Sequence, residues 1–273
     1  MTKAFSRQNI PKFEIYTFCH GSKYKPILSH WEKRTRYLHP NTKVRTLENY
    51  IFRRLSGYAW WDIVRLEKLI KIMAKKRIPI VYCDLDLILE RNISPLVELN
   101  YDFIVSKEIG GGSAFPKEVS SDLGFGLCTG FYITKYSSIE FLRRILLLMR
   151  KQHYGSNSDQ VTIMHYIHEN EKGIEFRNEY ICNKEYTNIV IRIDGINICI
   201  LDSDIITRDP ITDNDQFGNH INIDNVGGSN NFIKYFYSPL DKLPLTCRCG
   251  RFGNADECLH LSQRETAVSE EIE

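Results

Sequence analysis

No run in this chain approaches the roughly 20 consecutive apolar residues that a membrane-spanning helix needs. The first residues, Met1 to Gln8, lead into no long apolar stretch either, so the sequence predicts no signal peptide. These two absences predict a cytoplasmic protein.

The chain also lacks internal repeats and the aromatic signatures of RNA-binding modules, so no nucleic-acid partner is expected. Hydrophobic residues make up 42% and charged residues 26%, which is ordinary for a globular protein. A length of 273 residues suits one large α/β domain or two small ones. Eight cysteines are present, but a cytosolic chain of this size is not expected to form disulfides.

Charge is distributed unevenly along the chain. Residues 1–77 hold 18 Lys and Arg residues against 5 Asp and Glu residues, a net charge of +13, whereas the remainder carries −11. A basic N-terminal third suits an anionic ligand such as a nucleoside diphosphate, or contact at the periphery of an acidic membrane surface. A solvated basic face without a partner is the alternative.

Strand and helix patterns alternate along the chain, which predicts an α/β fold with a central, mostly parallel sheet flanked by helices. Strands are expected at residues 13–19, 43–47, 81–89, 102–106, 131–134, 189–193 and 196–201. Helices are expected at residues 25–38, 58–76, 139–151, 158–169 and 231–237. A loop is expected from Gly110 to about Gly126, a hairpin turn at Asp194-Gly195, and a disordered tail at residues 262–273.

One segment is more informative than any other: Val81-Tyr82-Cys83-Asp84-Leu85-Asp86-Leu87-Ile88-Leu89. In a strand, Asp84 and Asp86 would point to the same side where the strand leaves the sheet. Two carboxylates this close repel each other unless a cation lies between them. Mg²⁺ and Mn²⁺ prefer carboxylate oxygens, and such an ion usually carries a phosphate-bearing substrate. A helix cap and a surface ion pair would also explain an isolated pair of this kind.

Two short patterns accompany this segment. Asp62 and Arg65 lie three apart in the expected helix, so they share one of its faces. The planar guanidinium of Arg65 could bind a phosphate or orient a carboxylate, and a surface ion pair is the alternative. Cys128-Thr129-Gly130-Phe131 precedes a strand, and Gly130 would let the backbone approach a ligand closely or form a tight turn.

Further candidates lie nearer to the C-terminus. Ser158 or Asn157 can cap a helix that has Asp159 and Gln160 near its start, although capping does not explain the Asp-Gln pair. His220 could be a third metal ligand and Lys234 a phosphate contact. A lone histidine is more often structural.

Taken together, these motifs resemble those of GT-A fold glycosyltransferases of the D-x-D nucleotide-sugar type. The matching elements, in the family's order, are Asp62-x-x-Arg65, Tyr82-Cys83-Asp84-Leu85-Asp86, Thr129-Gly130-Phe131, Asp159-Gln160, and His220-x-Asn222 with Gly227, Gly228 and Lys234. The spacing is closest to that of the nucleotide-diphospho-sugar transferase family. The Asp-x-x-Arg helix is similar to that of Gly_transf_sug (DXD sugar-binding) proteins and clostridial glucosylating toxins. Cys128 stands where such families often have Asn, and Arg77-Ile78-Pro79 stands where Gly-Gly is expected.

The resemblance implies an activity and a domain organisation. Residues 1–240 would form a GT-A catalytic domain, followed at 241–273 by a cysteine-containing extension with an acidic tail. The enzyme would be a metal-dependent, hexosyltransferase-like glycosyltransferase. It would move a sugar from a nucleotide diphosphate sugar, with a UDP-sugar favoured, to a carbohydrate-containing, lipid-linked or protein acceptor with retention of configuration.

The same resemblance assigns roles to individual residues. The implied donor-binding residues are Thr17, Phe18, Asp62, Arg65, Asp84, Thr129, Gly130 and Lys234. Asp84, Asp86 and His220 would hold Mn²⁺ or Mg²⁺, which bridges the two phosphates. Asp159 or Gln160 would face the reacting sugar carbon or bind sugar hydroxyls, as the catalytic pair.

Two other readings of the sequence stay open. Haloacid-dehalogenase-type phosphatases also carry D-x-D at a strand end, and there Asp84 would be the nucleophile. Those enzymes usually have a small polar pair where this chain has Leu87-Ile88. At the C-terminus, Cys247, Cys249, Cys258 and His260 could form a structural Zn²⁺ site in a binding module, although their spacing is tighter than that of a zinc finger.

Overall fold

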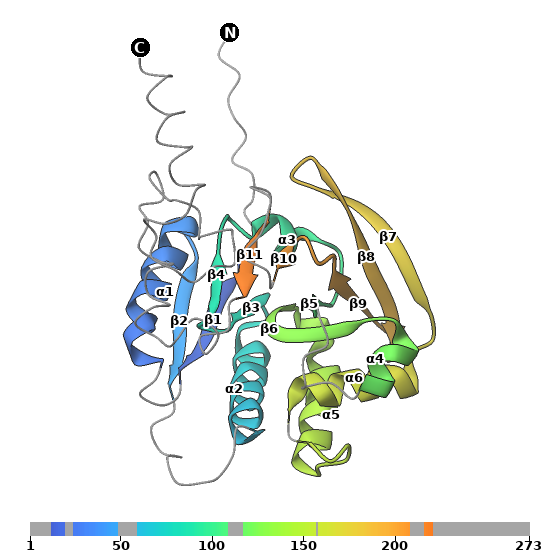
Figure 1. Ribbon diagram of the computed structural model, residues 1–273. Helices are drawn as coiled ribbons and strands as arrows, with labels where there is room; N and C mark the ends of the chain where they lie inside the picture. The colour runs from blue at the N-terminus through green and yellow to red at the C-terminus, as the bar shows by residue number, and fades with distance from the viewer. Residues whose placement is uncertain are drawn as a thin grey trace, which may run out of the picture.

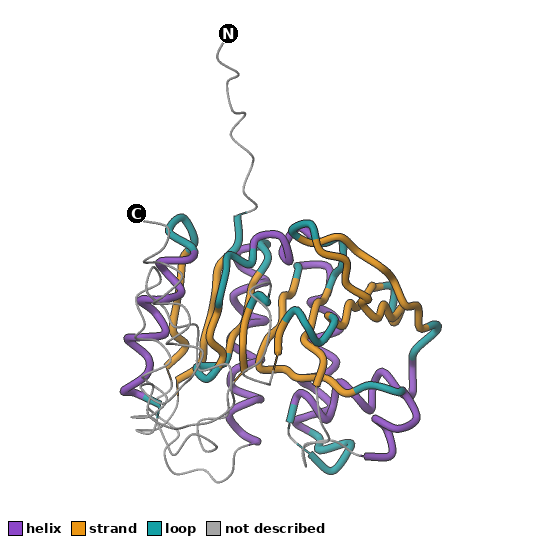
Figure 2. The backbone as a smooth tube through the Cα atoms, turned by 45° about the horizontal axis from the view of Figure 1, so that its top comes forward, coloured by secondary structure: helices purple, strands orange, loops and turns teal. Residues whose placement is uncertain are grey.

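The computed structural model describes residues 12–19, 24–48, 59–108, 117–156, 158–207 and 216–220. Within them, an eight-stranded sheet lies between helices on both of its faces, as Figure 1 and Figure 2 show from two directions. The predicted α/β fold is confirmed.

The strands of the large sheet lie in the spatial order β2 (Lys43–Glu48), β1 (Glu14–Cys19), β3 (Ile80–Cys83), β6 (Gly126–Thr134), β5 (Phe103–Glu108), β9 (Ile196–Leu201), β8 (Lys184–Ile193) and β7 (Ile174–Ile181). A second, three-stranded sheet contains β10 (Ile206–Thr207), β11 (Gly218–His220) and β4 (Leu87–Leu89).

The large sheet is mixed, which differs from the mostly parallel sheet that the sequence predicts. β1 is parallel to both β2 and β3, and β5 is parallel to β9. In contrast, β6 runs antiparallel to both β3 and β5, and β7, β8 and β9 form an antiparallel meander. Short connections explain the meander, because the turns at Cys182-Asn183 and Asp194-Gly195 can join only antiparallel strands.

Two hydrophobic cores hold the layers together. The helices that cover the faces are α1 (Lys25–Leu38), α2 (Ala59–Lys76), α3 (Ser94–Glu98), α4 (Lys117–Leu123), the short 3₁₀ helix η1 (Tyr136–Ser138), α5 (Ile139–Arg150) and α6 (Asp159–Asn170). One core joins α1 and α3 to one face of the sheet. The other joins α2, α5 and α6 to the opposite face. Neighbouring strand residues such as Ile15 and Tyr16 enter different cores, as the alternation of side chains along a strand requires.

Helix α2 shows how the sequence pattern produces this packing. The apolar residues with helical spacing are all buried on the sheet: Ile63, Leu66, Leu69, Ile70 and Met73. The helix ends before Arg77, whose φ of 53° lies in the left-handed region, and Pro79 then leads into β3. The chain therefore enters the central strand immediately before Asp84.

Several local features differ from the expectations. The D-x-D segment is not one continuous strand, because β3 ends at Cys83 and the chain turns before it enters β4 in the small sheet. The expected loop between residues 110 and 126 includes helix α4. The hairpin at Asp194-Gly195 is confirmed, with positive φ angles at both residues.

Other expectations lie outside the described residues. These are the helix at 231–237, the tail at 262–273 and the domain boundary after residue 240. Among the described residues, no helix combines the length and the hydrophobicity needed to cross a membrane. Five cysteines are described, at positions 19, 83, 128, 182 and 199, and none of them forms a disulfide with another described residue.

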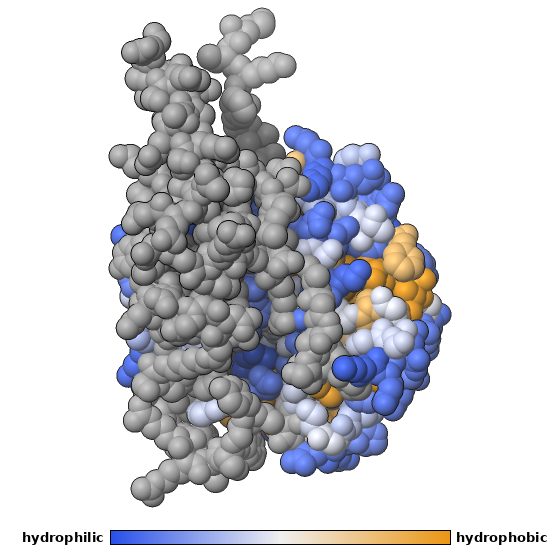
Figure 3. Space-filling view, in the orientation of Figure 1, coloured by the Kyte–Doolittle hydropathy of each residue, from blue (hydrophilic) through white to orange (hydrophobic). Residues whose placement is uncertain are grey.

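The surface also has a distinct apolar region. Figure 3 shows hydrophobic residues gathered on the side of the molecule where β7 and β8 lie. On β7, Phe176 and Tyr180 are each 74% exposed and lie four residues apart, so they share one face of the strand.

We expect His39 to make the fold sensitive to acid. Its ring is buried against the edge of Phe13, and neither ring nitrogen has a hydrogen-bond partner in the described part of the chain. Burial lowers the pKa of His39 from 6.5 to about 4. The unfolded chain therefore binds a proton that the folded chain does not, and stability falls as the pH drops from 6.5 towards 4.

His39→Leu should remove this part of the acid sensitivity, which we estimate at about 2 kcal/mol of unfolding free energy between pH 7 and pH 4.5. Urea unfolding at the two pH values measures the difference. His153→Leu, at an exposed position, is the matched control. If His39→Leu loses as much unfolding free energy between pH 7 and pH 4.5 as the wild type, His39 is not a source of the acid sensitivity.

Candidate functional site

The first part of the site is a turn that projects both aspartates from the sheet. The backbone N–H of Asp84 donates to the carbonyl of Gly130 over 2.8 Å, which ties the end of β3 to β6. The N–H of Leu87 donates to the carbonyl of Asp84 over 3.1 Å and closes the turn. Asp84 and Asp86 therefore project from one turn, whereas the sequence predicted one side of a strand.

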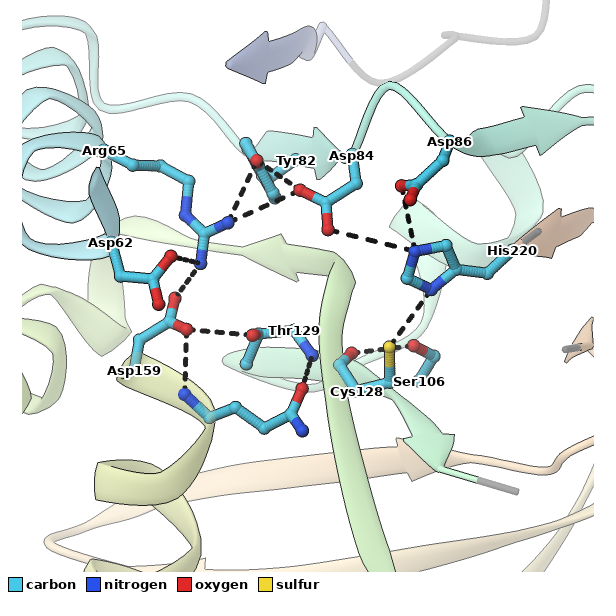
Figure 4. Close-up of polar contacts among 11 residues, drawn as sticks. Asp62, Arg65, Tyr82, Asp84, Asp86, Ser106, Cys128, Thr129, Asp159 and His220 are labelled. Atoms are coloured by element: carbon cyan, nitrogen blue, oxygen red, sulfur yellow. Dashed lines mark hydrogen bonds and ion pairs between the residues drawn. The ribbon is translucent and has the colours of Figure 1, made fainter. Parts of the chain in front are cut away.

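A histidine from a distant part of the chain completes this group. β11 pairs antiparallel with β4, and this register sets His220 opposite Leu87, next to the turn. His220 Nε2 lies 3.0 Å from Asp86 Oδ1 and 3.9 Å from Asp84 Oδ2 (Figure 4). The three residues can each offer one ligand atom within 4.8 Å of the other two.

This donor set fits a divalent cation. Two carboxylate oxygens and one imidazole nitrogen are donors that Mn²⁺ accepts, and the carboxylates also suit Mg²⁺. No other group of three or more potential ligands is present in the described part of the chain. The proposed zinc ligands Cys247, Cys249, Cys258 and His260 lie outside those residues.

The charges in this group are mutually dependent. Burial raises the pKa of Asp84, Arg65 lowers it and Asp86 raises it, and the net shift is upward. Burial lowers the pKa of His220, but Cys128 and Asp86 raise it more, so its net shift is also upward. A cation that binds here would have to displace the proton from His220.

Arg65 compensates the negative charge of the site. This arginine is almost fully buried on α2. Its Nη2 lies 2.5 Å from Asp159 Oδ2 and 3.1 Å from Asp62 Oδ1. Its Nη1 lies 3.0 Å from the Tyr82 hydroxyl and 3.4 Å from Asp84 Oδ1 (Figure 4). One guanidinium thus joins α2, the end of β3 and the start of α6.

Tyr82 supports the orientation of Asp84. The Tyr82 hydroxyl donates to Asp84 Oδ1 over 2.5 Å, and its ring lies under the Arg65 guanidinium at 4.6 Å. Tyr82 and Arg65 both contact Oδ1 of Asp84, and Oδ2 is the oxygen that faces His220. No role of Tyr82 was predicted from the sequence, although residues two apart in an extended segment point to the same side.

The carboxyl group of Asp62 has a raised pKa in this network. Burial raises the pKa of Asp62 to about 7, Arg65 opposes the shift, and Asp159 and Asp84 add to it. The Asp-x-x-Arg pair is therefore part of a larger buried cluster and is not an isolated surface ion pair.

Thr129, Asp159 and Gln160 form a hydrogen-bonded group next to Arg65. Asp159 is buried, and its Oδ1 accepts from the Thr129 hydroxyl over 2.9 Å and from the Gln160 N–H over 2.8 Å. Gln160 Oε1 accepts from the Thr129 N–H over 3.2 Å. Since Asp159 Oδ2 is bonded to Arg65, both oxygens of this carboxylate have protein partners.

A bulge in β6 brings these residues to the site. The pairing between β5 and β6 shifts between Val105 and Ser106, so that Thr129, Gly130 and Phe131 have no partner on β5. The Ser106 hydroxyl donates to the carbonyl of Cys128 over 2.8 Å and fixes the bulge. Cys128, to which sequence reasoning gave no role, lies with Sγ 3.2 Å from His220 Nδ1.

Residue 130 has to be glycine because the side chain of His220 lies very close to its backbone. A Cβ at this position would lie 2.4 Å from His220 Cε1 and 3.0 Å from Asp84 Oδ2. The reason for glycine is therefore space for the histidine ring, whereas the sequence predicted a close approach to a ligand or a tight turn.

The remaining predicted donor residues lie at the same edge of the sheet or outside the described chain. Thr17 and Phe18 are buried near the end of β1, the strand that pairs with β3. Thr17 Oγ1 has no hydrogen-bond partner among the described residues, and Phe18 packs against Trp61 at 6.0 Å. Lys234 is not among the described residues.

We expect Gly130→Ala to displace His220 and to weaken divalent-cation binding at least about tenfold, because the new methyl group overlaps the ring. Calorimetric titration with Mn²⁺ measures the effect. Gly173→Ala is the matched control, since a Cβ there meets nothing within 4 Å. Equal affinities in both variants would contradict the expectation.

Removing Arg65 should strongly destabilise the fold. Arg65→Met leaves a buried group of carboxylates without its cation, and we expect a loss of about 3–5 kcal/mol in unfolding free energy. Arg150→Met provides the control, because the Arg150–Glu67 ion pair is exposed and should contribute less than about 1 kcal/mol. Urea unfolding of both variants tests the difference, and similar losses would contradict it.

Of three comparisons with known proteins, only the one with solved structures finds matches. No protein-family model matches the chain, and a search of curated proteins finds no relative. Among solved structures, a glycosyltransferase involved in the glycosylation of the major capsid of PBCV-1 aligns with 83% of this chain and 98% of its own, at a TM-score of 0.54 and 13% identity.

Two other structures align over smaller shares. The glycosyltransferase GlyE of Streptococcus pneumoniae TIGR4 matches 57% of this chain and 43% of its own, at a TM-score of 0.41 and 15% identity. The galactosyltransferase LgtC, solved with donor and acceptor sugar analogs, matches 55% of this chain and 69% of its own, at a TM-score of 0.40 and 15% identity. The alignment with the PBCV-1 enzyme carries the conclusion that this chain has the GT-A glycosyltransferase fold, as its ordered motifs predict.

Proposed function

We propose that this protein is a metal-dependent glycosyltransferase that moves a sugar from a nucleotide diphosphate sugar, with a UDP-sugar favoured, to a carbohydrate-containing acceptor. The observation that carries the proposal is the convergence of Asp84, Asp86 and His220 at the end of β3 in a glycosyltransferase fold. The basic N-terminal third of the sequence supports an anionic donor.

The three convergent side chains would hold Mn²⁺ or Mg²⁺. When bound there, the cation would neutralise negative charge that develops on the departing nucleoside diphosphate. Arg65 and the Tyr82 hydroxyl hold Asp84 Oδ1, so the other oxygen is kept towards His220 without any change of rotamer. Such preorganisation avoids the cost of reorienting the carboxylate during the reaction.

The donor would lie along the edge of the sheet between β1 and β6. Thr17 and Phe18 on β1 are proposed contacts for the nucleoside, and Thr129 and Gly130 on β6 for the sugar. Lys234 is a further proposed contact for the diphosphate.

The proposed roles of Asp159 and Gln160 differ. Because both oxygens of Asp159 are bonded to protein groups, this carboxylate would orient Arg65 and Thr129. Gln160, which is only half-buried, is then the residue proposed to meet the reacting sugar carbon or the sugar hydroxyls. Retention of configuration is part of the proposal, since the Asp-Gln pair resembles that of retaining enzymes.

The proposed acceptor carries carbohydrate, on a glycan, a lipid or a protein. The similar PBCV-1 enzyme acts in the glycosylation of a capsid, which supports a protein or protein-bound glycan. The proposed location is the cytoplasm, with peripheral membrane contact through the basic N-terminal third.

Calorimetric titration of UDP and GDP, with and without Mn²⁺, tests the donor class. We expect one nucleotide to bind only with Mn²⁺, and Asp86→Asn to weaken that binding at least about tenfold because it removes a charged ligand. Asp204→Asn, at an exposed position on the turn after β9, is the matched control and should bind normally.

Three outcomes would contradict the proposal. If neither nucleotide binds, the proposed donor class is wrong. If a nucleotide binds equally well without Mn²⁺, the proposed role of the cation is wrong. Phosphatase activity that Asp84→Asn abolishes, without nucleotide binding, would support the haloacid-dehalogenase reading instead. NMR of the anomeric proton in the first product distinguishes retention from inversion.

A further inference from the structure

The thiol of Cys128 lies against the ring of His220, on the side away from the two aspartates. Cys128 Sγ is 3.2 Å from Nδ1, and Asp86 Oδ1 is 3.0 Å from Nε2 (Figure 4). Each nitrogen of the imidazole therefore has its own neighbour, and the two neighbours differ in chemistry.

The backbone around Cys128 leaves the ring little freedom. Gly130 lies so close that a Cβ would overlap His220 Cε1. Cys128 is buried, and the Ser106 hydroxyl holds its carbonyl, so the sulfur is fixed relative to β6. Only 10% of the His220 side chain is exposed. The ring is thus confined between the β6 bulge and the turn after β3.

The tautomer of His220 decides which nitrogen can bind a cation. A ligating nitrogen needs a free lone pair, so a neutral ring must carry its proton on the other nitrogen. Nε2 is the nitrogen that faces both carboxylates. Nδ1 must then keep the proton and needs an acceptor, and metal-bound histidines almost always have one.

We propose that Cys128 is a positioning residue for the cation site, an inference that rests on the proposed metal-dependent function. Its sulfur accepts the Nδ1–H of His220, which fixes the ring orientation and leaves Nε2 free for the cation. The more usual acceptors in this place are a carboxylate or a backbone carbonyl. Sulfur is a weak acceptor, so this site holds its histidine by both hydrogen bonding and confinement.

Three substitutions separate the hydrogen bond from packing. Cys128→Ala removes the acceptor and leaves space beside the ring, whereas Cys128→Val removes the acceptor and fills that space with two methyl groups. We expect each to weaken Mn²⁺ binding at least about tenfold, the lower end of the range for lost outer-shell partners. Cys128→Ser keeps an acceptor oxygen, and we expect its affinity to stay within about threefold of the wild type.

Cys199→Ala is the matched control. Cys199 is also a buried thiol, on β9, and it belongs to the hydrophobic core on the α1 side of the sheet. We expect this variant to lose stability as Cys128→Ala does, but to bind Mn²⁺ with unchanged affinity. Thermal unfolding of the metal-free proteins shows that each variant is folded at the temperature of the titration.

Pulsed EPR of bound Mn²⁺ reports directly whether a nitrogen of His220 ligates the ion, which a measurement of stability does not. The wild type and Cys128→Ser should show nuclear coupling from the ligating ¹⁴N of His220. Cys128→Val should show this coupling reduced or absent in whatever complex still forms. His220→Ala provides the spectrum without this nitrogen.

Two results would overturn the inference, and they are distinguishable. If Asp86→Asn loses Mn²⁺ but Cys128→Val binds it within about twofold of the wild type with full ¹⁴N coupling, the cation site stands and Cys128 only packs. If the folded wild type binds no Mn²⁺ or Mg²⁺, the positioning role falls together with the proposed metal dependence.

Discussion

The arrangement of this site depends on one buried positive charge. The guanidinium of Arg65 contacts carboxylates from three separate segments, namely Asp62 on α2, Asp84 after β3 and Asp159 on α6. Without that charge, mutual repulsion would make it costly to hold these three carboxyl groups so close together. The five donors of an arginine, in a planar fork, can serve several partners at once, whereas a lysine ammonium cannot hold this geometry.

A second constraint is the position of the D-x-D turn between two sheets. β3 belongs to the large sheet, while β4 leaves it and pairs with β11 in the small one. The aspartates therefore lie at the junction, where the backbone no longer follows a ladder and both carboxylates can face the incoming histidine. The bulge in β6 supplies the other side of the junction, because it frees Thr129 and Gly130 from pairing with β5.

Much of this could be read from the sequence, and the limits have physical causes. Helical periodicity gave α2 and its buried face, and the spacing of two aspartates after an apolar run indicated a cation site with His220. The direction of β6 and the crossing of β4 into another sheet could not be read, because both depend on tertiary pairing and not on local pattern. The contact between Cys128 and His220 could not be predicted for a similar reason, since the two residues lie 92 positions apart in the sequence.

The small sheet also affects the order in which parts of the structure form. Asp86 and His220 are separated by 134 positions in the sequence. The strand β11, which places His220 beside the turn, spans only three residues. So short a strand has few ladder hydrogen bonds, and short elements of this kind open and close more readily than a long strand of the large sheet. A cation bound by both the turn and β11 would favour the state in which β11 is paired with β4. A chain can therefore possess most of its hydrophobic core, without the part around Phe217, while the candidate metal site is still unassembled.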